Sequence, residues 1–330
     1  MLHGVNKSME RRDMSRKHLV YVDGQEGTTG LRIHEVLSER QDIEVLKIDP
    51  DKRKDPAERA RLLNASDLAF LCLPDAASKE AAEMVTNPNS CLIDASTAFR
   101  TDPSWAFGLP ELAPNQRESI RRSKRIANPG CHATAFILLM RPLVDAGLIS
   151  PAQALSATSI TGYSGGGKKM IEQYEAGGDA ELLAPRPYAL SLSHKHLPEM
   201  TMHSRLQATP IFMPIVGPFY KGLTVSIPLP MTALKSGSSG EALHACLSER
   251  YSGEAFIRVM PLSDPNVLAH GFFDSQRCND TNRVELFVFA SPTQAILMAC
   301  LDNLGKGASG AAVQNMNLHL GCDEGAGLMI

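Results

Sequence analysis

The stretch HLVYVDGQEGTTGLRIHEVLSER, residues 18–40, combines a short apolar run, a glycine-rich loop and a segment whose apolar residues recur at helical spacing. This order predicts a strand, a loop and a helix. The glycines form a G-x-x-G-x-x-G pattern, a variant of the dinucleotide-binding fingerprint, in which backbone amides approach a pyrophosphate at the helix N-terminus. A plain glycine turn is the alternative, but the flanking strand and helix favour a dinucleotide site.

Three further apolar runs follow at 43–48, 67–73 and 91–95, with helical stretches between them. Such alternation predicts a doubly wound, Rossmann-type α/β domain. Within this domain, DPDKRKD after the second run presents Asp49, which would suit a ribose 2′-hydroxyl, and then three cations, which would suit a 2′-phosphate. We favour the phosphate, and a solvated loop is the alternative.

The second half of the chain contains strand-like segments without regular helical alternation, such as GLTVSIPLPM and RVELFVFASP. We therefore expect a second domain with a mainly antiparallel sheet. The tail LMACLDNLGKGASGAAVQNMNLHLG has helical periodicity broken by glycines, and we expect a C-terminal helix that returns to the first domain. The expected divisions are a disordered or extended lead-in at 1–17, a cofactor domain at 18–130 and 301–330, and a catalytic domain at 131–300.

The segment Asn128-Pro129-Gly130-Cys131 places a single thiol where a turn gives way to the apolar run AFILLM. A helix N-terminus favours the thiolate and can hold an oxyanion, so this cysteine is a candidate nucleophile. A buried, inert cysteine is the alternative. The periodic run after Cys131 predicts a helix that reaches Leu143, with Pro142 kinking or shortening its end.

The segment SHKHLPEM, residues 193–200, supplies the usual acid/base partner of a thiol, a histidine, together with a carboxylate that can orient it. A metal site is disfavoured because this segment lacks a third or fourth ligand nearby. Ser96 and Arg100 follow an expected strand, and Lys168 follows the glycine-rich loop 165–167, so these three are candidate anion ligands. The alternatives are surface polar residues for Ser96 and Arg100, and a flexible connection for the loop.

The composition fits an ordinary globular protein of 330 residues, with 43% hydrophobic and 21% charged residues and a formal net charge of -3. That charge gives no electrostatic reason to expect a nucleic acid or a membrane as a partner. Seven cysteines without a C-x-x-C pair argue against a disulfide framework and favour a reducing, cytoplasmic location. No apolar stretch approaches the roughly 18 residues needed to span a membrane. Residues 1–17 lack the apolar core of a secretion signal, and a transit peptide stays an alternative.

The motifs DGQEGTTGLRI, DASTAFR, ANPGCHATA, SGGGKK and SHKHLPEM, with the glycine-rich tail, resemble those of the N-acetyl-gamma-glutamyl-phosphate reductases of the semialdehyde dehydrogenase superfamily, in their shorter type. The resemblance runs from about residue 18 to residue 321. It implies NADPH-dependent reduction of N-acetyl-L-glutamyl 5-phosphate to the 5-semialdehyde and phosphate, in arginine biosynthesis. In that reaction the thiol forms a thioester, which hydride from the nicotinamide reduces to an aldehyde.

Carried onto this chain, the resemblance makes Cys131 the nucleophile, His196 the acid/base and Glu199 its orienting carboxylate. The residues assigned to the cofactor are Gly24, Gln25, Glu26, Gly27, Thr28, Thr29, Gly30, Arg53, Pro74, Gly165 and Asn315. The residues assigned to the substrate are Ser96, Arg100, Asn128, Lys168 and His194. His132 stands where this family often has an aromatic residue. A homo-oligomer, dimer or tetramer, is expected, with no metal.

Three other functions stay open at this point. Another acyl-phosphate reductase, such as an aspartate-semialdehyde dehydrogenase, would use the same cofactor and thioester chemistry. A cysteine hydrolase would need the thiol and the histidine but would leave the glycine loop without a task. A non-catalytic NADP-binding protein would bind the dinucleotide and leave Cys131 unreactive.

Overall fold

The computed structural model describes residues 16–236 and 238–330. The expectations for the lead-in 1–17, including a transit peptide, therefore lie outside the described residues except at Arg16 and Lys17.

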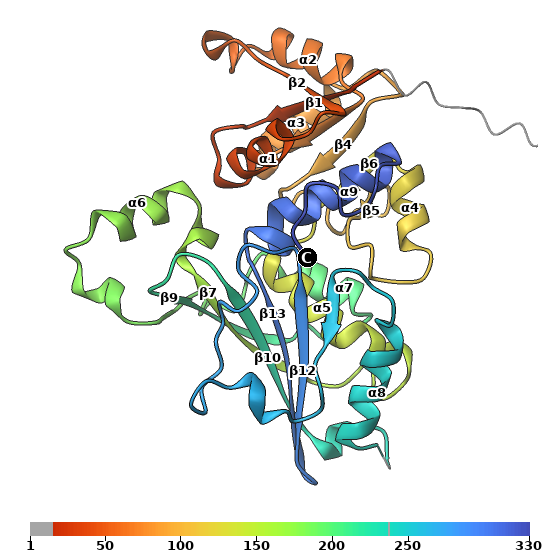
Figure 1. Cartoon of the computed structure of the whole chain (residues 1–330), viewed down its shortest axis with the longest axis vertical. Coiled ribbons are helices and arrows are strands. Elements are labelled where there is room, and N and C mark those ends of the chain that lie inside the picture. The colour runs from red at the N-terminus through yellow and green to blue at the C-terminus, as the bar shows by residue number, and fades with distance from the viewer. Residues whose placement is uncertain (1–15, 237) are drawn as a thin grey trace, which may run out of the picture.

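The first sheet has six strands, all parallel, in the order β2-β1-β3-β4-β6-β5. The strands are β1 (His18–Asp23), β2 (Ile43–Leu46), β3 (Leu68–Leu71), β4 (Cys91–Asp94), β5 (Ala106–Phe107) and β6 (Arg125–Ala127). Alternate residues of β1 and β3 enter two separate apolar clusters, so both faces of the sheet are buried. This is the predicted doubly wound domain, and it occupies the top of Figure 1.

The helices of the chain are α1 (Thr28–Ser38), α2 (Pro56–Ala65), α3 (Asp75–Glu83), α4 (Gln116–Arg122), α5 (Cys131–Asp145), α6 (Lys168–Ala176), α7 (Leu197–His203), α8 (Gly240–Arg250) and α9 (Gly310–Leu320). One face of the first sheet packs against α1, α4 and α9, and the other packs against α2 and α3. The predicted helix after the thiol is α5, which continues to Asp145 with Pro142 inside its last turn.

The second sheet has seven strands in the order β11-β12-β13-β10-β7-β9-β8, and four of its six pairings are antiparallel. The strands are β7 (Ser156–Gly162), β8 (Arg186–Pro187), β9 (Ile211–Gly217), β10 (Leu223–Pro230), β11 (Ile257–Val259), β12 (Val284–Ala290) and β13 (Gln294–Leu301). The predicted mainly antiparallel sheet is confirmed.

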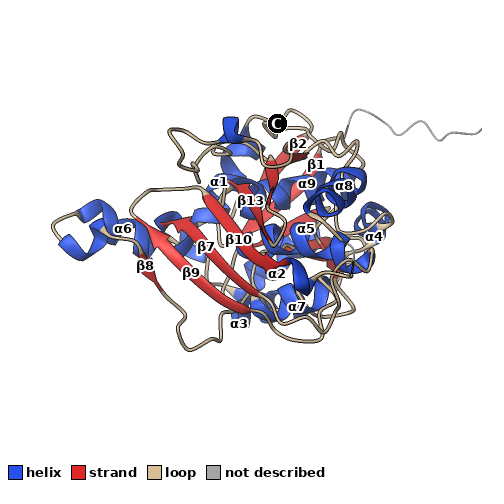
Figure 2. Ribbon diagram, turned by 90° about the horizontal axis from the view of Figure 1, so that it is seen from below, coloured by secondary structure: helices blue, strands red, loops and turns tan. Residues whose placement is uncertain are grey.

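Helices α5, α7 and α8 gather on one side of this second sheet (Figure 2), and their apolar residues form one cluster with its inward face. The side chains of Ile160, Met213 and Ile296 lie together on the opposite face of this sheet. This follows from the strand register, because residues paired across neighbouring strands point to the same face. These three side chains are 38%, 41% and 44% exposed, so this part of the outer face is an uncovered apolar surface, whereas the segment 260–278 packs over Phe287 and Cys300 of the same face.

The expected helical tail is partly wrong. Its first residues, 297–301, belong to β13, which pairs with β10 and β12 on its two edges. A π-helical turn, Gly305–Ser309, then leads into α9. As predicted, α9 returns to the first domain, where it contacts α1, α4 and β4 (Figure 1).

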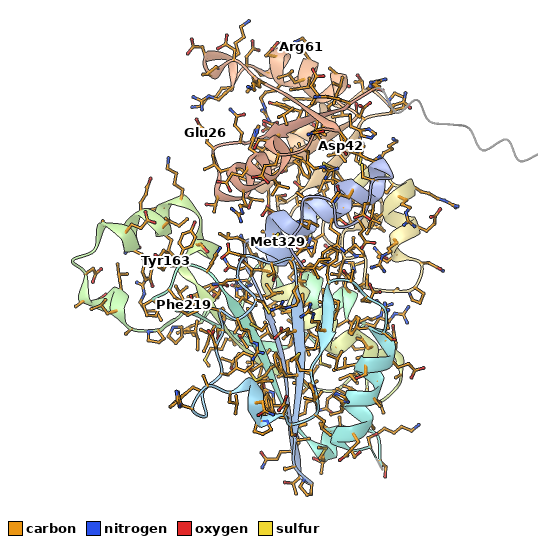
Figure 3. All side chains as sticks on the ribbon, in the orientation of Figure 1. Glu26, Asp42, Arg61, Tyr163, Phe219 and Met329 are labelled. Atoms are coloured by element: carbon orange, nitrogen blue, oxygen red, sulfur yellow. The ribbon has the colours of Figure 1, made fainter. Side chains whose placement is uncertain are left out.

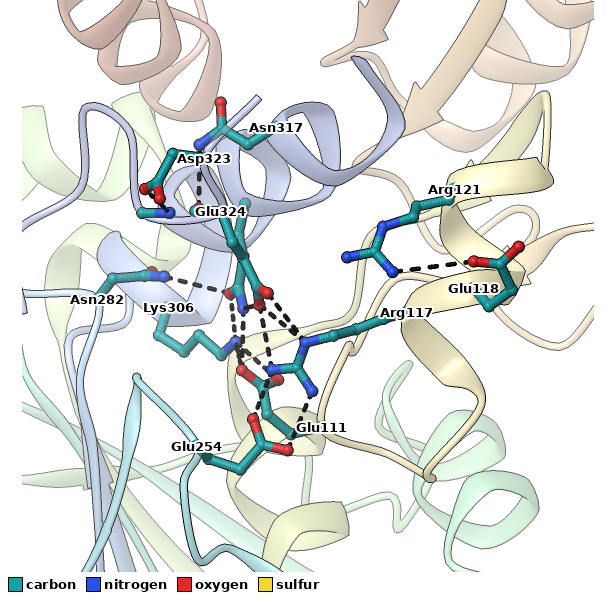
Figure 4. Close-up of polar contacts among 12 residues, drawn as sticks. Glu111, Arg117, Glu118, Arg121, Glu254, Asn282, Lys306, Asn317, Asp323 and Glu324 are labelled. Atoms are coloured by element: carbon teal, nitrogen blue, oxygen red, sulfur yellow. Dashed lines mark hydrogen bonds and ion pairs between the residues drawn. The ribbon is translucent and has the colours of Figure 1, made fainter. Parts of the chain in front are cut away.

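A buried polar network joins this returning segment to both domains (Figure 4). The Lys306 ammonium donates to both carboxylate oxygens of Glu111, at 2.8 and 2.9 Å, and both side chains are 0% exposed. Arg117 from α4 bridges Glu254, after α8, and Glu324, after α9. The network therefore fixes α9 between the two sheets.

Among residues 16–236 and 238–330, no helix has the length and apolar character to cross a membrane.

Candidate active site

Two adjoining cavities lie at the carboxyl ends of the first sheet's strands. The strand-end cavity, of about 400 Å³, is bordered by the ends of β1 and β3. The thiol chamber, of about 510 Å³, contains Cys131, and both cavities share Gly27, Cys72 and Leu73 in their walls. The sheet reverses its strand order between β1 and β3, which is where open α/β sheets bind ligands.

The glycine loop fits a close approach by a dinucleotide. Gly24 has a φ of +86°, and a Cβ there would lie 2.3 Å from the Cys72 carbonyl oxygen. A Cβ on Gly30 would lie 2.6 Å from the Gly24 oxygen. Helix α1 begins at Thr28 without a side-chain cap, so its first N–H groups can face an anion. At Gly24 and Gly30, only glycine allows the loop to fold this tightly against the strand ends.

The assigned cofactor residues divide between the two cavities, with one exception. Gly24, Gln25, Glu26, Gly27, Arg53 and Pro74 line the strand-end cavity. Gly27, Thr28, Thr29, Gly30 and Gly165 line the thiol chamber. Asn315 lies elsewhere: it is 0% exposed, and its amide donates to the Gly108 oxygen at 2.8 Å and the Asn128 Oδ1 at 3.2 Å. The structure thus makes Asn315 a support for Asn128, behind the chamber wall.

Cations border the strand-end cavity on the β2 side. Arg53 and Lys54 line it, and Arg53 pairs with Glu26, which lies at the edge of the first domain (Figure 3). Arg59 also lines the cavity but is held by Asp23 at 2.8 Å. Asp49 is exposed and caps a short turn by accepting from the Asp51 N–H, so it stands outside the cavity lining.

Cys131 is the first residue of α5, and the backbone N–H of His132 interacts with its sulfur. Burial nevertheless raises the pKa of the thiol to about 11, against the lowering effects of that N–H, Arg100 and Lys195. This differs from the expected thiolate. A helix N-terminus contributes a modest local effect, which removal of the thiolate from water outweighs here. The thiol therefore needs a base.

His196 lies against the turn that precedes the thiol. A Cβ on Gly130 would be 2.4 Å from its Cε1 and 2.5 Å from its Nε2, so the imidazole packs directly on the Gly130 backbone. Burial, followed by the charge of Arg100, lowers the pKa of His196 well below its usual value. A neutral imidazole beside the thiol is a proton acceptor.

Glu199 does not orient His196 as expected. Its two oxygens accept from the Arg100 Nη1 at 2.6 Å and from the Gly130 N–H at 3.1 Å. The Nδ1 of His196 is buried and has no hydrogen-bond partner among the described residues. Glu199 thus holds Arg100 and the Gly130 turn in place, and so positions the thiol and the imidazole through the backbone.

Four of the five residues expected to bind the substrate line the thiol chamber, and one does not. Arg100, Asn128, Lys168 and His194 line the thiol chamber, and the Lys168 side chain is 73% exposed at its rim. Arg100 already donates to the oxygens of Asn128 and Ala95 as well as to Glu199. Ser96 differs from the expectation, since its hydroxyl donates to Asp94 at 2.7 Å and lies outside the chamber lining.

Several residues of the chamber were not anticipated. Lys195, between the two histidines of the motif, lines it, and its charge adds to burial in lowering the pKa of His194. Tyr188 and His132 form a second wall. Gly307, from the returning tail, packs so closely that a Cβ there would lie 2.7 Å from the Cys131 Cβ. Lys195 and His132 were visible in the motifs SHKHLPEM and ANPGCHATA, whereas the contacts of Tyr188 and Gly307 have no local signal.

Within the described ranges, no group of three or more His, Cys, Asp or Glu side chains is arranged to hold a metal ion.

Family models match both halves of the chain. The model described as "Semialdehyde dehydrogenase, NAD binding domain" matches residues 18–120, and that described as "Semialdehyde dehydrogenase, dimerisation domain" matches residues 131–303.

The chain is similar to the N-acetyl-gamma-glutamyl-phosphate reductase 2 of Nostoc sp., at 45% identity over 94% of this chain and 99% of that protein. It is also 44% identical to the N-acetyl-gamma-glutamyl-phosphate reductase of Burkholderia ambifaria, over 92% of this chain and 96% of that protein.

Among solved structures, the aspartate semialdehyde dehydrogenase II of Vibrio cholerae has the same fold. Its TM-score is 0.69 at 17% identity, over 93% of this chain and 99% of that chain. An identity this low supports the fold alone.

Proposed function

Since the chain belongs to the semialdehyde dehydrogenase family, in its N-acetyl-gamma-glutamyl-phosphate reductase branch, we propose that it reduces N-acetyl-L-glutamyl 5-phosphate to N-acetyl-L-glutamate 5-semialdehyde and phosphate. The proposal includes a role in arginine biosynthesis. The observation that carries it is one chamber in which a thiol and a neutral imidazole meet beside a dinucleotide-type glycine loop.

Cys131 acts as the nucleophile in this proposal. Because burial raises the thiol pKa to about 11, His196 takes the proton as sulfur attacks the acyl carbon, and a thioester forms as phosphate leaves. The first N–H groups of α5 have no side-chain cap and stabilise negative charge on the acyl oxygen. Glu199 keeps this arrangement through Gly130 and Arg100.

Arg100, Asn128, His194 and Lys168 are the proposed contacts for the anionic substrate, and we add Lys195. Arginine and lysine side chains suit phosphate and carboxylate groups, and the chamber brings these side chains around one space. Ser96 would act indirectly, through Asp94.

A nicotinamide cofactor belongs to this family, and we propose NADP. When bound, it supplies the hydride that converts the thioester into the aldehyde. The loop 24–30 would hold its pyrophosphate, with Pro74 and Gly165 nearby, and Arg53 and Lys54 would face a 2′-phosphate. The exposed position of Asp49, outside the cavity lining, supports NADP over NAD.

The chain would act as a homo-oligomer in the cytoplasm. The uncovered apolar face carrying Ile160, Met213 and Ile296 supports self-association, as does the match to a dimerisation domain. Light scattering would test this, and a monomer at micromolar concentration would refute it.

The test of function is the reverse reaction, in which N-acetyl-L-glutamate 5-semialdehyde, phosphate and NADP give NADPH absorbance. We expect turnover that Cys131→Ser abolishes without loss of NADP binding. His196→Ala should lower kcat by roughly 10²–10⁴-fold and change the pH–rate profile. L-aspartate 4-semialdehyde is the competing substrate, and preference for it would refute the assignment.

A further inference from the structure

Three side chains form a hydrogen-bonded chain at one wall of the thiol chamber, where His132 and Tyr188 line the cavity and Ser159 lies behind them. The Nδ1 of His132, in the first turn of α5, lies 2.8 Å from the Ser159 Oγ on β7. Its Nε2 lies 3.1 Å from the Tyr188 hydroxyl oxygen, after β8. Ser159 is 0% exposed and His132 is 3% exposed, whereas Tyr188 is half-buried and borders the chamber. Ser159 lies outside the chamber lining and both ring nitrogens of His132 are engaged, so among these three side chains the Tyr188 hydroxyl is the group that can bind a ligand.

The direction of these hydrogen bonds follows from the charge of the imidazole. Burial lowers the pKa of His132 to about 3, so the ring is neutral and carries a single N–H. Two arrangements are then possible. Either Ser159 donates to Nδ1 and the Nε2–H donates to Tyr188, or the ring donates to Ser159 and Tyr188 donates to the ring.

The burial of Ser159 decides between the two arrangements. Its hydroxyl has no other hydrogen-bond partner among the described residues, so a serine that accepted from the ring would leave its own proton unpaired in the interior. An unpaired buried proton of this kind lowers the stability of the fold by about 1–3 kcal/mol. A serine that donates its proton to Nδ1 avoids this loss. The Nε2–H then donates to the Tyr188 oxygen, and the phenolic proton is free to point into the chamber.

The side chains in contact with Tyr188, those of His132 and His194, are uncharged. Burial lowers the pKa of His194 to about 4, so this ring is neutral beside Tyr188, and the side chain of Val216 completes the wall. Burial also raises the pKa of the tyrosine, so its hydroxyl stays protonated. Among the described residues no hydrogen bond or ring contact joins Tyr188 to a cation, although the charges of Lys195 and Arg100 add to the lowering of the His194 pKa. A neutral acceptor suits the wall best.

We propose that Ser159 and His132 are positioning residues that fix the Tyr188 hydroxyl as a hydrogen-bond donor to the neutral amide carbonyl of an N-acylated substrate. This inference rests on the proposed function and extends it. It explains how the chamber would distinguish an acetamido substrate from one that lacks that group, because a donor without its acceptor stays unpaired when such a substrate displaces water.

The test compares two substrates in the reverse reaction: N-acetyl-L-glutamate 5-semialdehyde and the five-carbon semialdehyde acid without the acetamido group. Tyr188→Phe should raise KM for the acetylated substrate about threefold to tenfold, the loss expected for one neutral hydrogen bond. The kcat value should stay within about twofold of wild type, as should KM for phosphate and for the substrate without the amide. Tyr220→Phe, at a tyrosine outside the chamber lining, is the matched control.

Ser159→Ala should cause a smaller rise in KM, because Nδ1 can then take the proton and reverse the hydrogen bond to Tyr188. The double variant should be no worse than Tyr188→Phe, since the serine acts only through the tyrosine. Additive effects would overturn the positioning role. Equal losses of kcat with both substrates would place the hydroxyl at the reacting carbonyl and overturn the amide assignment. No wild-type turnover with either substrate would refute the proposed function and this inference with it.

Discussion

Replacing Gly130 with alanine tests how closely the thiol, the imidazole and the arginine are packed. The added Cβ would lie 2.4 Å from the His196 Cε1 and 2.5 Å from the Arg100 Nη1, whereas ordinary contacts begin near 3.4 Å. Both groups, or the Gly130 backbone between them, must therefore shift by about 1 Å. Arg100 is held by Glu199, Asn128 and Ala95 and resists such a shift, so we expect the geometry of the turn and of the imidazole to change most.

A misplacement of about 1 Å at a reacting group costs about 100-fold in rate, or about 2.7 kcal/mol of transition-state stabilisation. We expect Gly130→Ala to lower kcat in the NADP-linked reverse assay by that factor, with NADP affinity unchanged because the glycine loop 24–30 is untouched. Gly325→Ala is the matched control, since its Cβ would meet nothing closer than 3.4 Å and its φ is not positive. Wild-type kcat in Gly130→Ala would refute the role of this contact.

Three further outcomes are expected. The rate at which iodoacetamide alkylates Cys131 should rise about tenfold per pH unit between pH 8 and 10. The reason is that burial raises the thiol pKa to about 11 and only the thiolate reacts. A flat pH profile, measured by mass spectrometry, would contradict this prediction. Arg53→Ser should raise KM for NADP about 10-fold to 100-fold, as expected for the loss of one charged hydrogen bond, and leave KM for NAD nearly unchanged. Equal changes in KM for NADP and NAD would refute the contact between Arg53 and the 2′-phosphate. Lys306→Met should lower the free energy of unfolding in urea by about 3–5 kcal/mol, because the Glu111 carboxylate would be buried without a counter-ion. The double variant Lys306→Met/Glu111→Leu should recover much of that loss. An unchanged urea midpoint in the single variant would refute the stabilising role of this buried ion pair.

The first domain was predictable because its parallel strands are buried on both faces and so appear as continuous apolar runs between helical segments. The run 297–301 was misassigned for the same reason. A short apolar segment fits a buried helix or a buried strand equally well, and only its pairing with β10 and β12 decides.

Cys131 and His196 could be selected from sequence because each lies in a compact motif. The partners of Glu199 could not, since its ion pair with Arg100 joins residues 99 positions apart. Asn315 was assigned to the cofactor. Its amide is instead used to satisfy the Gly108 carbonyl and Asn128 in the interior, a need that only the folded arrangement reveals.

The segment 302–320 has a consequence for protein synthesis. Every strand of both sheets precedes it in the chain, yet its π-helical turn packs on Cys131 and α9 fills the core of the first domain. A ribosome therefore synthesises every strand before the segment that closes the chamber. We expect a nascent chain without this segment to be inactive, because Gly307 packs on Cys131 and Asn315 supports Asn128.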